Sequence, residues 1–530
     1  MHPPPRSPLS YLLSVFMWSG VRWPVAGGTM KNWMSTLAFE PLMLLVLLIL
    51  PVTVLWFAWK RSRSSLPPGK QGFPLVGETM QLISAYRSEH PNSFMDERME
   101  MHGQVFTSHV FGETTVFSSD PDVNRHVLQK EGRLFQSSYP SSIGALLGKN
   151  SVVISRGPYH KQLHSFTLAS FSNQTVLRDL LLPDIDRLIR QNTIDAWKDG
   201  QTVILHEQAK KMTFEIAVKQ LMSREPGEWT EGLRRDYGLV IDGFFSIPFP
   251  FARLLPFTIY GRAIRARLRI AQQIRPVVTK RIRDFASGVR SEVVDVLDKL
   301  LMEEGVKDED KVVDYVFSML VGIHETTSIS MTCVVKFLTE NPAAMAELRE
   351  EHDKIKNKQE GSGFHWNDYK NMMPFTQCVI TETLRMSNIV SGVFRRCATD
   401  VDIKGFKIPK GRKIYASFRA VHMNEDYFED ARTFNPWRWM KKVDEDETEE
   451  DSKKKTATES DKKRLLCLFG GGPRLCPGYE LSRLELCVFL HYLVTSFTWD
   501  TAGEDSMVFF PTTRTVKGLP IRVSRRASCK

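Results

Sequence analysis

The chain has 530 residues, a length that is consistent with one large fold. Lysine and arginine total 71 against 61 aspartate and glutamate, so the formal net charge is +10. An excess this mild excludes the strong basic signature of a nucleic-acid-binding protein, and it suits a protein that rests on an anionic membrane or docks an acidic partner. The 7 cysteines are odd in number and all lie from Cys333 onward, so no disulfide framework is indicated and a reducing compartment is expected.

One segment near the N-terminus is apolar enough to cross a membrane. No charged residue occurs from Pro41 to Trp59, and about 20 residues at ~1.5 Å each span a hydrocarbon core of roughly 30 Å. Lys60, Arg61 and Arg63 follow at once, which places the downstream chain on the cytosolic side. A cleaved signal peptide would instead carry its basic residues before the apolar run and a small-residue cleavage site after it. We therefore expect a single-pass signal anchor.

Composition divides the rest of the chain. Residues 1–40 support no assignment, and Met30 is an alternative start to Met1. Residues 441–463 are nearly all charged or hydroxyl-bearing, so they cannot bury a core and are expected to form a disordered surface insertion. The expected order is an unassigned N-terminal segment (1–40), an anchor (41–59), a basic and proline-rich hinge (60–77) and one globular domain (78–530).

The globular part shows mostly helical periodicity. Apolar residues recur at helical spacing through 175–300, and the longest helical pattern runs from about Glu309 to Leu338. Short alternating runs around Gly-containing turns predict hairpins. Two strand pairs are expected, Val105–Val110 with Thr114–Phe117 and Val401–Ile403 with Phe406–Ile408. The expected class is therefore mainly α with small β-sheets (α+β).

The segment Phe244–Phe251 is aromatic, broken by prolines and followed by an arginine-rich helical run at 262–269. An apolar loop beside a basic helix is typical of shallow membrane insertion, and equally of a buried loop next to a solvated helix. Both interpretations stay open on the sequence alone.

Polar residues interrupt the middle of the long helical pattern. The stretch Gly322-Ile323-His324-Glu325-Thr326-Thr327 places a carboxylate and two hydroxyls within an apolar helix. Such groups are costly to bury unless they border a cavity or bond to backbone carbonyls.

A Gly- and Pro-rich loop surrounds Cys476 close to the C-terminus. The stretch from Phe469 to Gly478 is predicted to be irregular, and a helical pattern begins at Glu480. The positive end of a helix and the nearby Arg474 favour a thiolate, and free glycine N–H groups can bond to its sulfur. The alternative is that Cys476 is an ordinary small core residue. The pattern predicts an anionic, soft metal ligand facing a large flat group.

Two other pairs of residues have helical spacing. His160 and His164 share one helix face, which could suggest zinc, but no further ligand accompanies them. Glu382 and Arg385 lie at i and i+3, where opposite charges can pair. Neither pair is informative by itself.

Taken together, these stretches resemble the motifs of the cytochromes P450. The pattern Phe-x-x-Gly-x-Arg-x-Cys-x-Gly is complete at 469–478 and resembles the family's haem-thiolate loop. The His160 pair, the Gly322–Thr327 stretch and the Glu-x-x-Arg pair with Arg438 stand in the family's order. The resemblance implies the cytochrome P450 fold with an N-terminal transmembrane helix, and a monooxygenase that uses haem b (iron protoporphyrin IX), O2 and NADPH-derived electrons.

The resemblance also implies a role for each motif residue. Cys476 would be the axial ligand of the haem iron, and Glu325 and Thr326 would relay protons to iron-bound oxygen. The residues expected to hold the haem are Phe469, Gly472, Arg474, Gly478, His160, His164 and Arg395. Glu382, Arg385 and Arg438 would form a structural network behind the ligand loop. Ile323, where glycine is usual, and His164, where arginine is usual, depart from the family pattern.

Several runs are similar to the plant steroid hydroxylases of brassinosteroid biosynthesis, among them Phe135–Pro140, Leu146–Lys149 and Pro436–Trp439. This similarity implies a phytosterol substrate that is hydroxylated on its side chain, at C-22 or C-23. The alternative substrate class is a triterpenoid. The residues expected to line the pocket are Phe135, Tyr139, Leu147, Ser318, Gly322, Val390, Val393 and Thr512.

The expected partners are NADPH–cytochrome P450 reductase, a sterol and the endoplasmic reticulum membrane, with the catalytic domain cytosolic and no nucleic acid bound. A haem-thiolate isomerase or dehydratase would need no reductase, but such enzymes tend to lose the threonine that is present at Thr326. A non-catalytic, membrane-held steroid-binding protein would need no thiolate.

Overall fold

The computed structural model describes residues 66–70, 72, 77–246, 255, 257–302, 308–358, 363–440, 465–510 and 512–526. The chain separates into a unit of residues 1–65 and a unit of residues 66–530, and every described residue belongs to the second unit. The predicted anchor at 41–59, most of the hinge and the charged insertion at 441–463 lie outside the described residues. Among the helices that are described, none has both the length and the apolar character needed to span a bilayer.

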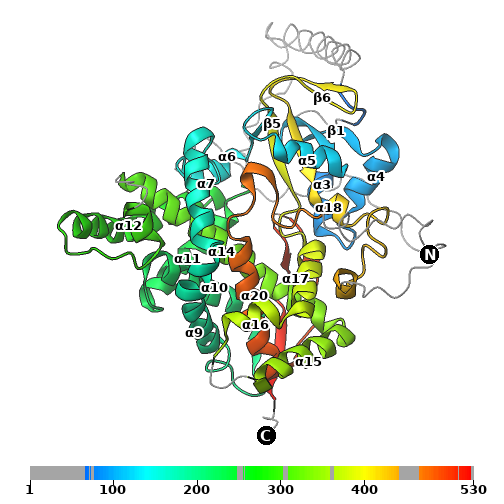
Figure 1. The fold of residues 1–530 in the computed structure, drawn as a ribbon. Helices are drawn as coiled ribbons and strands as arrows, with labels where there is room; N and C mark the ends of the chain where they lie inside the picture. The colour runs from blue at the N-terminus through cyan, green and yellow to red at the C-terminus, as the bar shows by residue number, and fades with distance from the viewer. Residues whose placement is uncertain are drawn as a thin grey trace, which may run out of the picture. The chain divides into compact units, whose positions relative to one another are not determined.

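Helices make up most of the second unit (Figure 1). The first are α3 Thr79–Arg87, α4 Ser93–His102, α5 Pro121–Gln129, α6 Ser141–Leu147, α7 Gly157–Phe171, α8 Gln174–Val176, the π-helical η1 Leu177–Leu181, α9 Leu182–Asn192, α10 Leu205–Met222 and α11 Glu228–Asp242. The later ones are α12 Ile259–Ala286, α13 Val296–Met302, α14 Glu309–Thr339, α15 Pro342–Lys358, α16 Trp366–Asn371, α17 Pro374–Ser387, α18 Phe418–His422 and α20 Tyr479–Ser496, with short 3₁₀ turns η2 Pro436–Trp439 and η4 Gly472–Arg474.

The strands form small sheets at one end of this unit and near its C-terminus (Figure 1). A five-stranded sheet has the order β1-β2-β8-β5-β3, from Val105–Val110, Glu113–Ser118, Lys413–Ser417, Gly392–Cys397 and Phe135–Ser137. The others are β4-β12-β9 (Thr202–Ile204, Pro520–Arg525, Phe497–Thr501), β6-β7 (Val401–Ile403, Phe406–Ile408) and β10-β11 (Met507–Val508, Arg514–Thr515). The mainly helical class with small sheets is thus confirmed, and so are both predicted hairpins.

The long helix α14 is the centre of the helical part. It begins directly after its cap residue, Asp308, whose Oδ1 accepts hydrogen bonds from the backbone N–H groups of Asp310 and Lys311. Its 31 residues extend for roughly 46 Å at ~1.5 Å per residue, and they contact α10, α12, α17 and α20. The predicted span from Glu309 to Leu338 is confirmed to within one residue.

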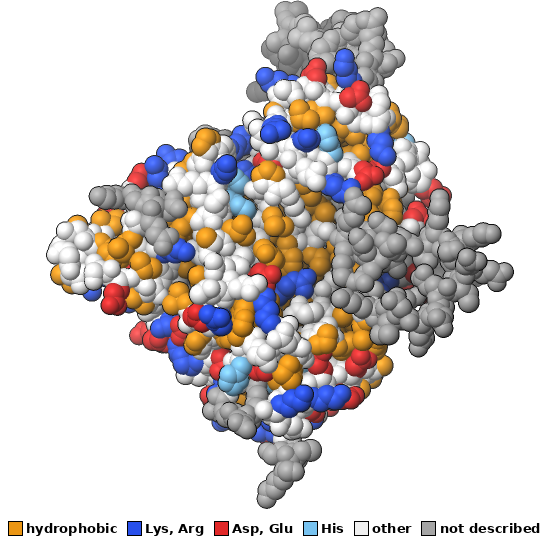
Figure 2. All heavy atoms as spheres, viewed as in Figure 1, with side chains coloured by type: hydrophobic (Ala, Val, Ile, Leu, Met, Phe, Trp, Pro, Cys, Tyr) orange, Lys and Arg blue, Asp and Glu red, His pale blue; other side chains and the backbone are white. Residues whose placement is uncertain are grey.

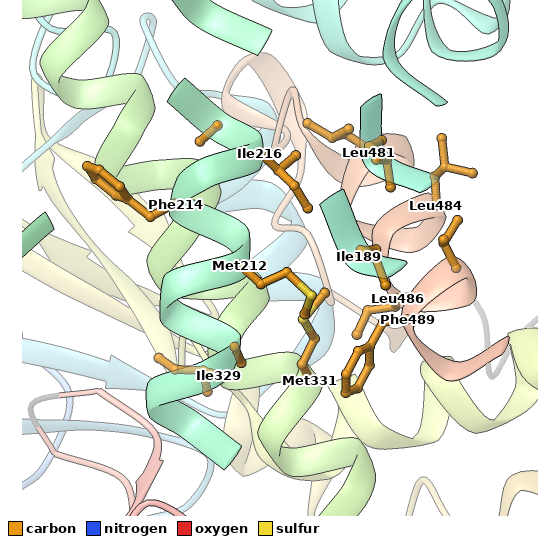
Figure 3. Packing of buried hydrophobic residues seen from close by; sticks show 14 of the residues in the cluster. Ile189, Met212, Phe214, Ile216, Ile329, Met331, Leu481, Leu484, Leu486 and Phe489 are labelled. Carbon is orange, nitrogen blue, oxygen red and sulfur yellow. The ribbon is translucent and has the colours of Figure 1, made fainter. Parts of the chain in front are cut away.

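The main hydrophobic core lies where α9, α10, α14 and α20 meet (Figure 3). Met212 of α10 lies beside Met331 of α14 with Phe489 of α20 close by, and Ile189 of α9 lies between α10 and α20. Burying an aliphatic or aromatic side chain of this kind contributes about 1.5–3 kcal/mol. The core therefore holds α20, and with it the end of the Cys476 loop, against α14.

Candidate active site

The Cys476 loop crosses from the end of the charged insertion to the start of α20. Gly470 and Gly472 have φ angles of +74° and +63°, a conformation that favours glycine. A Cβ at Gly472 would collide with the carbonyl of Leu128 on α5, so the loop and α5 approach closely only because this residue is glycine. The Cys476 N–H donates to the Phe469 carbonyl at 2.9 Å and closes the loop. The predicted irregular loop and the helix that follows it are both present.

Two side chains from the α7 region fix the backbone on both sides of Cys476. His164 Nε2 lies 2.7 Å from the carbonyl oxygen of Leu475, and Ser172 Oγ donates to the carbonyl of Pro477 at 2.7 Å. Because a carbonyl can only accept, His164 carries its proton on Nε2. His164 was expected at a haem propionate, and in the structure its Nε2 contacts the Cys476 loop. Ser172 belongs to no motif, so no pattern in the sequence predicts this contact.

The electrostatics of Cys476 differ from the expectation that Arg474 favours its thiolate. Burial raises the pKa of the Cys476 thiol, and the hydrogen bond from the Gly478 N–H lowers it by less. Arg474 is turned toward Glu131, to which its Nε donates at 2.8 Å, and toward the carbonyls of Val153 and Ser155. Its guanidinium is thus already paired, because these three acceptors surround it.

A compact group of charges lies beside the loop. Glu131 sits between Arg474 and the almost fully buried Arg395, whose Nε is 2.6 Å from Glu131 Oε2. That Nε and that Oε2 form no well-directed hydrogen bond within the described part of the chain. His160 is close by: burial first, then Arg474, His164 and Arg395, lower its pKa to about 4, so its imidazole is neutral at pH 7. Two guanidinium groups therefore face one carboxylate, and the group keeps a positive charge for an anionic ligand.

Helix α14 presents one open strip in an otherwise buried segment. Gly322 and Thr326 are solvent-accessible, whereas His324, Thr327 and Ser328 are buried. Residues four apart lie on one face, so the open strip borders a space, and a Cβ at Gly322 would meet nothing within 4 Å. Thr326 Oγ1 donates to the Gly322 carbonyl at 2.8 Å, a bond between i and i−4 that leaves the hydroxyl oxygen free to accept another.

Glu325 and His324, which lie between Gly322 and Thr326 in the sequence, differ in their surroundings. Burial raises the pKa of the Glu325 carboxyl, with a smaller opposing effect from Lys210, and its Oε2 has no hydrogen-bond partner among the residues described. His324 faces the core, where its ring meets Phe214 and Tyr237 edge-on and its Nδ1 lies 2.7 Å from the Leu320 carbonyl. Glu325 is therefore a carboxyl that can hold a proton, and His324 is a packing residue.

Glu382 is the centre of a buried network behind the loop. Arg385 donates to both of its oxygens at 2.8 and 2.9 Å, and Arg438 Nε donates to Oε1 at 3.0 Å. Trp439 Nε1 adds a bond to Oε2 at 2.8 Å. The side chains of Glu382 and Arg385 are 0% exposed, so water offers these charges no alternative partner. The structure brings these three predicted residues together, and Trp439 is an additional member.

His422 links this network to Cys467, two residues before the Cys476 loop. Arg385 donates to its carbonyl at 2.6 Å, and its Nε2 accepts from the backbone N–H of Cys467 at 3.1 Å. Its Nδ1 therefore carries the proton and donates to Asn388 Oδ1 at 2.8 Å. Burial, followed by Arg385 and Arg419, lowers the pKa of His422 to about 3, which keeps the ring neutral. No sequence motif singled out this residue.

The expected pocket residues are placed in three different settings. Leu147 and Ser318 belong to the buried helical part, and Ser318 Oγ donates to the carbonyl of Tyr315. Phe135 differs from the expectation: it is fully buried in a separate core with the sheet, its ring edge-on to His126, because β3 pairs with β5. The others are at least partly accessible: Tyr139, Gly322, Val390, Val393 and Thr512.

The residues around the loop fit a haem. The residues from Leu465 to Gly478 are all at least partly accessible although most of α20 behind them is buried, and the open strip of α14 offers a second accessible face. Two guanidinium groups, those of Arg395 and Arg474, share the single carboxylate of Glu131, and the remaining positive charge suits the propionates. No group of three or more His, Cys, Asp and Glu side chains that could hold a bare metal ion occurs among the described residues.

Comparisons with known proteins agree on one family. The family model described as cytochrome P450 matches residues 67–521. Rice cytochrome P450 90A4 is 52% identical over 87% of this chain and 91% of its own length. The 3beta,22alpha-dihydroxysteroid 3-dehydrogenase of Arabidopsis thaliana is 50% identical over 88% of this chain and 93% of its length, and the Arabidopsis 3-epi-6-deoxocathasterone 23-monooxygenase CYP90C1 is 39% identical over 88% and 86%.

A solved structure supports the fold. Retinoic acid-bound cyanobacterial CYP120A1 superposes with a TM-score of 0.74 at 25% sequence identity, over 87% of this chain and 99% of that chain.

Proposed function

Because the chain belongs to the cytochrome P450 family, we propose that Cys476 is the axial thiolate ligand of its haem. The chain is a monooxygenase that uses haem iron, O2 and electrons derived from NADPH. The observation that carries the ligand assignment is the loop, in which the N–H of Gly478 reaches the Cys476 sulfur and α7 fixes the carbonyls on both sides. Bound iron would take the place of the thiol proton, so the pKa raised by burial would not prevent Cys476 from binding as a thiolate.

The same proposal gives a role to the charged group beside the loop. Arg395 and Arg474 would bind the propionates, with neutral His160 as a hydrogen-bond partner and Glu131 holding both guanidinium groups in place. Phe469, Gly472 and Gly478 would shape the loop, and His164 would act through Leu475. The Glu382, Arg385 and Arg438 network would keep the loop positioned through His422.

Chemistry at the bound haem would insert one oxygen atom of O2 into a substrate C–H bond, with the thiolate favouring O–O cleavage. The chain must supply protons and exclude water. Thr326 Oγ1 lies on the open strip of α14, and the neighbouring Glu325 can hold a proton because burial raises its pKa. These two residues are therefore proposed to deliver protons, with Glu325 as the source and the Thr326 hydroxyl, once turned away from the Gly322 carbonyl, as the last donor.

The proposed substrate is a steroid of brassinosteroid biosynthesis, oxidised on its side chain at C-22 or C-23. Relatives named as a 23-monooxygenase and a steroid (22S)-hydroxylase, each 39% identical to this chain, support that position. The expected pocket residues carry no charge, which suits a lipid. A sterol that binds between α14 and the α6 region would meet few polar groups besides hydroxyls.

A second candidate, oxidation at C-3, is favoured by a higher identity. The relative named as a 3beta,22alpha-dihydroxysteroid 3-dehydrogenase is 50% identical, against 39% for the side-chain enzymes. The chemistry balances: insertion of one oxygen atom at the C-3 carbinol C–H gives a geminal diol and one water, and the diol loses a second water to give the ketone. NADPH supplies the two electrons. The same site could thus perform either oxidation, depending on which end of the steroid faces the iron.

The decisive experiment is product analysis with the purified holoenzyme, reductase and NADPH. Under the first candidate, campestanol should gain a side-chain hydroxyl. Under the second, the 3-hydroxyl of a 3β,22α-dihydroxysteroid should be oxidised to a ketone. Oxidation of β-amyrin with no conversion of either steroid would replace both by the triterpenoid interpretation. In parallel, Cys476→Ala should abolish the red-shifted Soret band of the reduced carbonyl complex, and retention of that band would refute the ligand assignment.

The proposed partner surface is the face that carries the ligand loop. In Figure 2, hydrophobic side chains gather near the centre of this face, with lysine and arginine side chains beside them. A membrane-bound diflavin reductase presenting acidic groups would dock there, so its association should weaken as salt rises. The anchor at 41–59 is proposed to hold the enzyme in the endoplasmic reticulum membrane with this domain in the cytosol. Removing residues 1–59 should release the protein from microsomes.

A further inference from the structure

Asp314 lies in the first half of α14, about 18 Å along the helix axis before Thr326. Its Oδ2 accepts two hydrogen bonds from one residue, Asn150, through the side-chain Nδ2 at 3.0 Å and the backbone N at 3.3 Å. Its Oδ1 forms an ion pair with Arg267 of α12. The carboxylate therefore joins three segments: the loop after α6, α12 and α14.

Arg267 strengthens this junction from the opposite side. Its Nε donates to the carbonyl of Leu146 at 3.0 Å, and its guanidinium lies 4.1 Å from the centre of the Phe317 ring on α14. The side chains of Arg267 and Asp314 are 12% and 14% exposed, so this pair is largely withdrawn from water. Such pairs differ from surface ion pairs because solvent cannot replace the lost partner.

Gly148 shows that the junction is closely fitted. This residue has φ +88°, and a Cβ there would collide with the Asp314 carboxylate. Glycine is therefore required at 148 for two reasons, its backbone conformation and the close approach of the carboxylate. The run Leu146–Lys149, one of those similar to the plant steroid hydroxylases, contains both the carbonyl bound by Arg267 and this glycine.

Two of the helices held together near Asp314, α6 and α14, carry residues that were expected in the pocket. Helix α6 carries Leu147, and its Ser142 Oγ donates to the Phe244 carbonyl after α11 at 2.6 Å. On α11, Tyr237 stacks on Phe317 with ring centres 4.9 Å apart. Release of Asp314 would thus loosen α6, α11 and α12 together while leaving the Cys476 loop and its braces intact.

We propose that Asp314 is a positioning residue that fixes α6 and α12 against α14 and so sets the affinity of the enzyme for a large apolar substrate. The link to substrate rests on the function proposed above. The contacts of Asp314 with Asn150 and Arg267, called the clamp below, do not depend on which lipid is bound. Asp314 touches neither haem nor the reacting atoms, so its effect should appear in binding and local mobility and not in haem content.

Two variants test the clamp from opposite sides. Asp314→Asn keeps the shape of the side chain and removes the charge that Arg267 needs, and Gly148→Ala keeps the charge and displaces the carboxylate. The matched control is Asp236→Asn on α11, which removes the carboxylate partner of Arg269. Arg269 lies two residues after Arg267 on α12, but its side chain is 49% exposed and pairs with α11. If Asp314 and Arg267 act as a pair, adding Arg267→Gln to Asp314→Asn should cause little further change.

The measurements use the holoenzyme and two azoles of different size. Clotrimazole, a large ligand, should bind about tenfold more weakly in both clamp variants, a change of ~1.4 kcal/mol, while imidazole should change by less than about twofold. Amide hydrogen exchange in residues 141–150 should rise in both variants and stay unchanged in Asp236→Asn. A weaker steroid-induced shift of the ferric Soret band, with turnover largely recovered at saturating steroid, should accompany these changes.

The proposal is overturned if exchange in 141–150 is unchanged, if both azoles weaken equally, if the control behaves like the clamp variants, or if both clamp variants lose haem. Should Asp314→Asn alone fail to hold haem, Gly148→Ala decides, because it leaves every charge in place. If no steroid binds even to the parent enzyme, the proposed substrate fails, and the azole and exchange data still decide the clamp.

Discussion

Replacement of Glu382 by glutamine should destabilise the protein strongly and cost it most of its haem. The carboxylate accepts two hydrogen bonds from Arg385, one from Arg438 and one from Trp439, and Asn435 N donates a further one at 3.0 Å. A glutamine side chain has one acceptor oxygen and one NH2 group, and that NH2 group would face donors. The variant therefore leaves the buried guanidinium of Arg385 without its carboxylate partner, and Arg438 stays beside it as a second positive charge.

The magnitude follows from the burial of the pair. Removing one partner of a buried ion pair costs about 3–5 kcal/mol because the other charge is stranded, and a whole protein is stable by only about 5–15 kcal/mol. Glu382 and Arg385 are 0% exposed, so no solvent relieves the stranded charge. Since Arg385 also donates to the carbonyl of His422, whose ring holds Cys467 N, the loss should reach the ligand loop.

The assay is denaturant unfolding together with haem content from the reduced carbonyl spectrum. The matched control is Glu113→Gln, which also removes a carboxylate with two cationic partners, Arg396 and Lys413, but whose side chain is 41% exposed. Exposed pairs contribute about 0–1 kcal/mol, so the control should retain its haem and nearly all its stability. Equal effects of the two substitutions, or an unchanged spectrum in Glu382→Gln, would refute the argument from burial.

Three further outcomes are expected. Thr326→Ala should keep haem and steroid binding while forming less product per NADPH consumed, by roughly 10²-fold or more if the hydroxyl is the last proton donor; unchanged coupling would exclude that role. The depressed pKa of His422, about 3, means that its neutral form stabilises the fold above its usual pKa of ~6.5. That contribution falls by ~1.4 kcal/mol per pH unit as the pH drops from about 6.5 toward 3, and His422→Asn should flatten the acid side of the stability curve. Exchange of residues 441–463 for a short Gly/Ser linker should leave haem content intact, and haem loss would show that the segment supports the loop.

Much of the site could be predicted from local sequence pattern. The Cys476 loop, the helix that follows it, α14 and both hairpins each depend on residues close together in the chain, where glycine, proline and periodicity restrict the backbone directly. The Glu382–Arg385 pair was also foreseeable because helical spacing alone brings i and i+3 together.

Other parts could be decided only by tertiary structure. Glu131 meets Arg474 across 343 residues, and Leu475 meets His164 across 311, so no local pattern encodes either contact. The expected roles of Arg474 beside the thiolate and of Phe135 in the pocket changed for the same reason. Their side-chain directions are set by partners just after α5, just before α7 and in the sheet. Sequence determined which residues can ligate iron, because that depends on residue type and local backbone; which charges meet, and which atoms remain free to bind a propionate or a proton, was decided by packing between distant segments.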